Sequence, residues 1–328
     1  MEGFGAEAIG DYTNGGKQLM VKIFFAGELR SPFIKQDMEL LQEDHEISVF
    51  DLSTCATTKT QMITRYPLAL ANQIANIIRS DILFIWYADY PGVPLLILAK
   101  IFGKPTIVNI GGAEVVAAPE IGYGHQLSRS RGFIARWILR KSSMNVVPSS
   151  AYVKITNNLV PSAKVIAIPN YIDSGLCDMP LPKKNPIATT AVCVSRTRLL
   201  KGIPTFEAAT KGRPYKSVIV KNMPHDKLME YFRQCKVYCQ LSYTETFGMS
   251  LLEAMACGCV PVVTDRDALP EVVGDCGLIV PYNDIQKTKQ AIEQAMSMSG
   301  EPARDRARQF NKERKRTSIN NLIAELVK

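Results

Sequence analysis

Short apolar runs alternate with longer amphipathic segments along the chain, and no other feature of the sequence constrains its fold as tightly. In the first half, the runs predicted to be strands are 21–25, 47–52, 82–86, 106–110, 145–148 and 165–168. The helical patterns that separate them lie at 33–43, 67–79, 93–102 and 132–141. Such alternation is typical of parallel βαβ units, in which a helix follows each strand and crosses back over the sheet.

The alternation restarts after residues 171–187, a stretch rich in Pro, Asp, Gly and Lys that we interpret as an interdomain linker. The predicted strands of the second half are 191–195, 217–220, 237–240, 260–264 and 278–280, and its predicted helices are 203–210, 226–235, 248–257 and 285–297. A length of 328 residues is enough for two cores. The sequence therefore predicts an α/β fold of two Rossmann-like, doubly wound lobes that face a cleft, with ligands beyond the carboxyl ends of the strands.

This pattern divides the chain into four segments. We expect residues 1–19 to be a disordered extension, 20–170 the N-terminal lobe, 171–300 the C-terminal lobe, and 301–328 a helical tail that packs back on the N-terminal lobe. The basic run 304–316 within the tail is interpreted as a solvated helix face.

Composition and charge exclude several classes of protein. The net charge of +8 favours anionic partners, but no nucleic-acid recognition motif accompanies it. Eight cysteines without C-x-x-C spacing and only three histidines argue against a zinc site and indicate reduced thiols in a cytoplasmic protein. No run reaches the roughly 18 apolar residues that a membrane span needs.

The clearest functional pattern lies between Glu245 and Val263. This segment follows a predicted strand, turns through Gly248 and opens a helix, whose free N–H groups and positive dipole end suit a diphosphate. Glu245 lies just before the helix, and Glu253 lies about a turn and a half beyond its start. One carboxylate can reach the group beside the phosphates, and the other can accept hydrogen bonds from a diol further along the ligand.

Here the sequence resembles the retaining glycosyltransferases of family four, which have the two-lobed GT-B architecture. The Glu245-x7-Glu253 spacing matches the signature of that family, and the flanking matches are Phe247-Gly248, Glu253-Ala254-Met255-Ala256, Gly258, Pro261-Val262-Val263, Pro270-Glu271-Val272-Val273, Gly277-Leu278-Ile279-Val280 and Asn283-Asp284. The resemblance implies that Glu245 is catalytic and touches the donor sugar, while Glu253 holds the nucleotide ribose. It also implies donor contacts from Phe247, Gly248 and Met249.

A second match lies upstream, in Ser195-Arg196-Thr197-Arg198-Leu199-Leu200-Lys201-Gly202. The resemblance implies that Arg196 and Lys201 bind the donor diphosphate. Fixed cations aimed at the leaving nucleotide stabilise the charge that grows as the glycosidic bond breaks, so no metal or other cofactor is expected. Arg198 is either a further cation for the phosphates or a solvated side chain, and Asp265-x-Asp267 is a short metal-type motif that the family does not need.

The predicted acceptor side comprises Gly111, Gly112, Glu114 and His125. The two glycines end a predicted strand, where the backbone can approach a ligand closely, and many family members carry an active-site histidine here instead. Glu114 either binds an acceptor hydroxyl or caps the following segment. His125 is either a base on the acceptor side or a polar surface residue.

Two further features have two interpretations each. The basic segment 129–141 is either a membrane-surface helix for a lipid-linked acceptor or a lobe helix whose apolar face lies in the core. Glu271 either caps the turn that it begins or contacts ligand.

We therefore predict a metal-independent, retaining glycosyltransferase of the hexosyltransferase type. It would move a sugar from a UDP- or GDP-sugar to a sugar or lipid-linked acceptor, with peripheral contact at the inner membrane surface. The alternative, motivated by the missing histidine, is a non-catalytic protein that binds sugar nucleotides. An epimerase on a related two-lobed fold is a third hypothesis, but the sequence offers no convincing set of acid and base residues for it.

Overall fold

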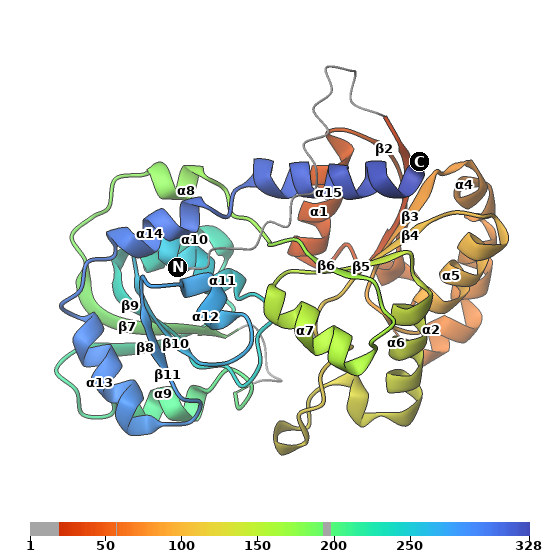
Figure 1. Ribbon diagram of the computed structural model, residues 1–328. Coiled ribbons are helices and arrows are strands. Elements are labelled where there is room, and N and C mark those ends of the chain that lie inside the picture. Colours follow the sequence, from red (N-terminus) through yellow and green to blue (C-terminus); the bar gives the residue numbers. More distant parts are fainter. Residues whose placement is uncertain (1–19, 57, 193–197) are drawn as a thin grey trace.

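Two separate parallel sheets organise the chain, one in each half (Figure 1). The computed structural model describes residues 20–56, 58–192 and 198–328. The extension predicted at residues 1–19 and the predicted donor-binding residue Arg196 lie outside this range. Within it, the predicted α/β fold of two doubly wound lobes is confirmed.

The N-terminal lobe contains a six-stranded sheet with the order β2-β1-β3-β4-β5-β6. Its strands are β1 (Lys22–Gly27), β2 (Glu46–Asp51), β3 (Ile82–Trp86), β4 (Thr106–Asn109), β5 (Met144–Val147) and β6 (Val165–Ala167). Its helices are α1 (Pro32–Gln42), α2 (Lys59–Thr64), α3 (Tyr66–Ala71), α4 (Ile74–Arg79), α5 (Gly92–Ile101), α6 (Arg129–Lys141) and α7 (Ser150–Leu159), with short 3-10 turns η1 (Leu52–Thr54), η2 (Pro119–Ile121) and η3 (His125–Leu127).

The C-terminal lobe contains a five-stranded sheet with the order β11-β10-β9-β7-β8. Its strands are β7 (Asn185–Val192), β8 (Lys216–Lys221), β9 (Cys235–Gln240), β10 (Val260–Thr264) and β11 (Leu278–Val280). The helices of this half are α8 (Gly175–Asp178), α9 (Ile203–Thr210), α10 (His225–Gln234), α11 (Met249–Ala256), α12 (Leu269–Val273), α13 (Ile285–Ala295), α14 (Glu301–Arg308) and α15 (Lys312–Val327).

Both sheets reverse their strand order at the same place. In each lobe the first strand pairs with the second on one side and with the third on the other, which puts the reversal between β1 and β3 and between β7 and β9. All the paired strands are parallel, so their carboxyl ends lie along one edge of each sheet. Ligands of doubly wound folds bind at this edge, in the crevice that the reversal opens.

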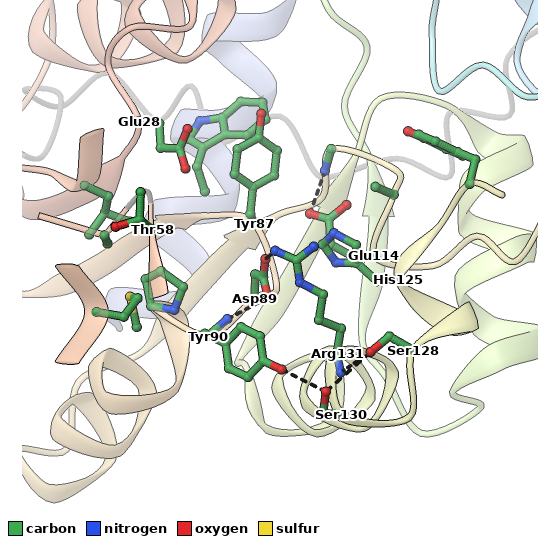
Figure 2. A pocket seen from close by; sticks show the side chains of 18 of the residues that line it. Glu28, Thr58, Tyr87, Asp89, Tyr90, Glu114, His125, Ser128, Ser130 and Arg131 are labelled. Atoms are coloured by element: carbon green, nitrogen blue, oxygen red, sulfur yellow. Dashed lines mark hydrogen bonds and ion pairs between the residues drawn. The ribbon is translucent and has the colours of Figure 1, made fainter. Parts of the chain in front are cut away.

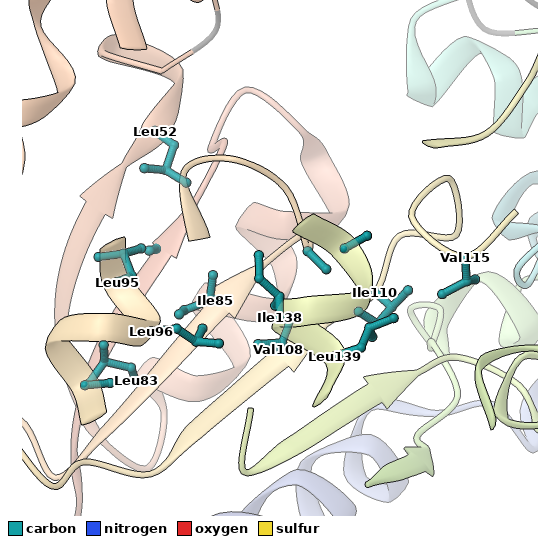
Figure 3. Packing of buried hydrophobic residues seen from close by; sticks show 14 of the residues in the cluster. Leu52, Leu83, Ile85, Leu95, Leu96, Val108, Ile110, Val115, Ile138 and Leu139 are labelled. Carbon is teal, nitrogen blue, oxygen red and sulfur yellow. The ribbon is translucent and has the colours of Figure 1, made fainter. Parts of the chain in front are cut away.

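Helices cover both faces of the N-terminal sheet, because alternate residues of each strand point to opposite faces. Leu83 and Ile85 of β3 pack with Leu95 of α5 and Ile138 of α6 on one face (Figure 3). The apolar face of segment 129–141 therefore lies in the core, as the lobe-helix interpretation expects. No helix among the described residues is long and apolar enough to cross a membrane.

The C-terminal tail crosses from one lobe to the other (Figure 1). Helix α14 packs against α11 in the C-terminal lobe. The next helix, α15, places Ile319, Leu322 and Ile323 in the second core cluster of the N-terminal lobe, together with Phe25 and Phe84. The last helix of the chain thus helps to cover one face of the N-terminal sheet.

The interpretation of residues 304–316 as a solvated face was wrong for Arg304 and Lys315. Arg304 is buried and donates to the carbonyl oxygen of Met179, and Lys315 is buried against the Asp37 carboxylate of α1. Asp37 also accepts a hydrogen bond from Asn109 at 3.0 Å. These two charged side chains pair with groups of both lobes. Basic residues that look solvent-exposed in the sequence thus lie at an interface within the protein.

Other differences concern missed elements and element boundaries. The single helix predicted at 67–79 is the pair of short helices α3 and α4, and α2 precedes them where no element was predicted. Helix α7 was missed because its last turns carry the polar, weakly helix-forming run Thr156-Asn157-Asn158. Strand β7 begins at Asn185, inside the predicted linker, since Pro186 and the threonines that follow obscure its apolar pattern.

Breaking the buried pair between Lys315 and Asp37 should destabilise the protein strongly. Lys315→Ala leaves the Asp37 carboxylate buried without its cation, and we expect unfolding in urea to show a loss of about 3–5 kcal/mol. The control is Lys312→Ala on the same helix, whose pair with Glu43 is exposed and should be worth less than about 1 kcal/mol. The double variant Asp37→Leu/Lys315→Met should recover most of the loss; equal stability of single and double variants would contradict the argument.

Candidate functional site

Polar side chains converge on Glu245 just beyond the carboxyl end of β9. Lys201 Nζ lies 2.5 Å from Glu245 Oε2, and Gln240 Nε2 donates to the same oxygen at 2.9 Å. Ser242 Oγ lies 3.3 Å from it. Lys201 belongs to the turn between β7 and α9, so the strand reversal of this lobe brings the two predicted residues together. Sequence reasoning missed Gln240, although a glutamine that ends a buried strand was a usable signal.

A second carboxylate holds the loop that carries Glu245. Asp267 Oδ2 accepts a hydrogen bond from the backbone N–H of Glu245 at 3.1 Å and another from the Thr244 hydroxyl. Asp267 has φ 47, in the left-handed region where glycine is the usual residue. Its partner in the D-x-D motif, Asp265, accepts from the backbone N–H of Tyr282 at 3.2 Å. Within the described ranges, no group of three His, Cys, Asp or Glu side chains is arranged to hold a metal.

Helix α11 starts at the predicted glycine and carries the second predicted carboxylate. Gly248 precedes the helix with φ 92, a conformation that disfavours any residue with a side chain. Glu253 lies in α11 with its side chain 14% exposed, and its Oε1 is 3.0 Å from His225 Nε2. Burial raises the pKa of Glu253, and the histidine opposes that rise. His225 was not predicted as a site residue.

Two predicted donor residues have structural contacts that limit their side chains. Phe247 is 2% exposed and packs edge-on against Phe310, so only its backbone is left for a ligand. Met249 is partly buried against the core of the C-terminal lobe. Arg198 is an exposed side chain that forms two hydrogen bonds to the Glu207 carboxylate, at 2.7 and 2.8 Å, as the solvated interpretation expects.

A pocket of about 1030 Å³ lies at the matching edge of the N-terminal lobe (Figure 2). It is lined by residues that follow β1, β3 and β4, among them the predicted acceptor residues Gly111, Glu114 and His125. The buried Glu114 carboxylate accepts hydrogen bonds from the backbone N–H groups of Gly111 at 3.1 Å and Gly112 at 2.8 Å. Burial raises the pKa of Glu114, whereas backbone N–H groups, among them those of Gly111 and Ala88, and the charge of His125 lower it. The Gly111 and Gly112 donors precede Glu114 in the chain, so the carboxylate holds the glycine turn before it and does not cap the following segment.

Several pocket residues were not predicted. The lining includes Glu28, Tyr87, Asp89 and Arg131, all labelled in Figure 2. Tyr87 follows β3 with φ 73, and a bulky residue in the left-handed region is an unfavourable conformation that the surrounding structure must impose. The sequence carries no signal for that backbone conformation. Glu28, in contrast, directly follows β1 and could have been found from its position at a strand end.

The pocket and the Glu245 loop meet where the lobes touch. Gly112 has φ 115, and a Cβ atom there would lie 2.2 Å from Cγ2 of Thr246. The Thr246 side chain therefore packs directly against the backbone of Gly112. The Tyr152 hydroxyl lies 2.8 Å from Thr244 Oγ1. Burial raises the pKa of Tyr123, a pocket residue, to about 12, and the charges of Glu114 and Glu245 add to the rise.

Glu271 does not cap the turn that it begins. Its carboxylate accepts hydrogen bonds from the backbone N–H of Ser150 at 3.0 and 3.1 Å and from the Ser150 hydroxyl at 2.6 Å. It therefore caps the free N–H groups at the start of α7, a helix of the other lobe. This contact ties the carboxyl edge of one sheet to that of the other.

Part of the chain is similar in sequence to known glycosyltransferases. Residues 207–316 match the family model described as glycosyl transferases group 1. O-antigen chain mannosyltransferase B of Escherichia coli is 35% identical over 74 residues, 23% of this chain and 19% of that protein. D-inositol 3-phosphate glycosyltransferase of Corynebacterium aurimucosum is 31% identical over 110 residues, 31% of this chain and 26% of the relative. The matches thus span about a fifth to a quarter of the length of these relatives.

Solved structures resemble the chain over nearly its whole length. Sucrose-phosphate synthase of Thermosynechococcus elongatus superposes with a TM-score of 0.72 at 17% identity and covers 93% of this chain and 99% of that one. Anabaena HepE in complex with UDP-glucose gives a TM-score of 0.72 at 15% identity and covers 93% and 100%. The chain therefore has the GT-B fold, and its residues 207–316 are similar to glycosyl transferases group 1.

Proposed function

We propose that the chain is a glycosyltransferase that moves a hexose from a nucleotide-sugar donor to an acceptor held in the N-terminal pocket. The observation that carries the proposal is the convergence of Lys201, Gln240 and Ser242 on Glu245 at the strand reversal of the C-terminal lobe. The matched family segment, 207–316, contains both Glu245 and Glu253. HepE, a relative in fold, is known in complex with UDP-glucose.

The donor would lie along the start of α11. The free N–H groups after Gly248 and the ammonium of Lys201 would face its diphosphate, and the Glu253 carboxylate would accept hydrogen bonds from the ribose. Negative charge grows on the leaving diphosphate as the glycosidic bond breaks, and fixed positive charge stabilises that change. The donor sugar would then lie against Glu245, beside the contact between Gly112 and Thr246.

Retention of configuration and independence from metal belong to this proposal. The choice between UDP and GDP, the location in the cytoplasm and a peripheral contact with lipid stay predictions. The deciding experiment is a thermal-shift panel of UDP- and GDP-sugars, followed by an assay for nucleoside diphosphate release with and without EDTA. We expect one donor to stabilise the protein and to be consumed equally in both conditions. Binding without consumption of any donor would favour the non-catalytic alternative, and activity restored only by Mg²⁺ or Mn²⁺ would contradict metal independence.

The pair between Lys201 and Glu245 predicts opposite effects of two substitutions on nucleoside diphosphate affinity. Lys201→Ala removes a charge-assisted contact and should weaken binding about tenfold to a hundredfold. Glu245→Gln releases Lys201 from its counter-charge, so binding should become several-fold tighter while sugar transfer falls by about a hundredfold or more. Calorimetric titration measures both.

The control ligand for these titrations is the free nucleoside, which carries no phosphate. It should bind wild type and both variants alike. An equal loss of nucleoside and diphosphate affinity in Lys201→Ala would show that the lysine supports the fold instead of the phosphates.

The raised pKa of Glu253 predicts a pH dependence of nucleoside binding. As the pH falls through that raised pKa, the carboxylate gains a proton and loses acceptor capacity for the ribose hydroxyls, so affinity should fall on the acid side. His225→Ala removes the one charge that opposes the rise, so the fall should begin at a higher pH. Titration with the nucleoside avoids the titration of phosphate itself. A 2′,3′-dideoxynucleoside should show no such dependence; if it does, Glu253 does not hold the ribose.

A further inference from the structure

The pocket of the N-terminal lobe carries information about the acceptor that the proposed function leaves open. We propose that it binds an uncharged glycoside with an apolar aglycone and disfavours phosphorylated acceptors. That this ligand is the acceptor of a transfer reaction rests on the proposed function. The preference for a neutral ligand follows from the lining of the pocket alone.

Carboxylates dominate the charged lining. Among the described residues that line the pocket, Arg131 is the only side chain of permanent positive charge, against Glu28, Asp89 and Glu114. Arg131 Nη2 lies 3.1 Å from Asp89 Oδ2, so its charge is matched within the wall. A phosphate entering the pocket would have to break this pair or remain without a cation, and an unpaired charge in a desolvated site is costly.

The electrostatic surroundings of Glu28 point the same way. Burial raises its pKa, the carboxylates of Asp51 and Asp89 raise it further, and Arg30 opposes them. The same negative field that disfavours the charge of Glu28 would repel an anionic ligand. The structure gives the Glu28 carboxylate no hydrogen-bond donor from the described residues, so its oxygens are open to the hydroxyl groups of a neutral sugar.

Aromatic and apolar side chains complete the walls. Tyr87 and Tyr90 flank the polar groups (Figure 2). Their rings suit the C–H faces of a sugar, and their hydroxyls can form hydrogen bonds. A separate flank is apolar, with Leu52, Met62 and Ile63 in the lining. The volume of about 1030 Å³ is at the upper end for small-molecule sites, which leaves room for an apolar group beside one sugar ring.

The test compares matched ligands by calorimetry, independently of turnover. The methyl β-glycosides of glucose, galactose and mannose are each titrated against their 6-phosphates and against their octyl counterparts below the micelle concentration. We expect the neutral member of each pair to bind more tightly than its phosphate. The octyl glycoside of the preferred sugar should bind about tenfold or more tighter than the methyl glycoside, because methylene groups are buried.

Matched variants locate these effects. Glu28→Gln should weaken neutral glycosides about tenfold or more and narrow the gap to the phosphates, whereas Glu39→Gln, an exposed carboxylate of α1 outside the lining, should change neither. Ile63→Ser should reduce the advantage of the octyl group. Leu68→Ser is its control, because Ile63 is 77% and Leu68 69% exposed but only Ile63 lines the pocket.

Each outcome decides the inference. Tighter binding of the phosphates, an unchanged affinity in Glu28→Gln, or no binding of any neutral glycoside at millimolar concentration would overturn it. Nucleoside diphosphate release is measured in parallel on the same protein. Glycoside binding as described without consumption of any nucleotide sugar would leave the pocket inference standing and remove the proposed function; consumption with a preference for phosphorylated acceptors would do the reverse.

Discussion

The alignment of parallel strands at their carboxyl ends is the constraint on which the rest of this structure depends. Each lobe reverses its strand order once, and the loops that leave the strands on either side of the reversal must diverge. In the C-terminal lobe β9, beside the reversal, leads to Glu245, and in the N-terminal lobe the divergence opens the pocket beside Glu28 and Tyr87. Neither site needs an insertion, because both arise from the order of the strands.

Contacts between the two lobes bring these edges together. Gly112 lies against the Thr246 side chain, and the Glu271 carboxylate caps the start of α7 through several hydrogen bonds. The C-terminal tail crosses between the lobes, and its helix α15 buries Lys315 against Asp37 where the sequence suggested a solvated face. The lobes are thus tied both at their functional edges and at the crossing of the last helix, which fixes the pocket next to the Glu245 loop.

The sequence predicted the fold well, and it predicted the positions of Glu245 and Glu253 relative to α11, because both depend on local patterns. Strands β10 and β11 have the predicted bounds, and the glycine before α11 stands where the turn required it. What it could not predict depends on tertiary contacts. The left-handed backbone of Tyr87, the use of Asp267 to hold a loop and the burial of Lys315 arise only when distant segments meet. Residues that bind other parts of the protein look, in sequence, like residues that bind solvent or metal.

The ion pair of Lys201 and Glu245 joins the proposed diphosphate contact to the proposed catalytic carboxylate. Both side chains are largely shielded from water, at 26% and 13% exposure, so each neutralises a charge that would otherwise be costly to bury. In the proposed donor complex, the diphosphate would compete for the ammonium, and the Glu245 carboxylate would lose its cation to the extent that Lys201 turned toward the phosphates. Gln240 and Ser242 remain to hold that carboxylate in place. Donor binding would therefore leave the Glu245 carboxylate without its counter-ion beside the donor sugar, where positive charge develops as the leaving group departs. The stabilising negative charge would thus become available only when the substrate is present.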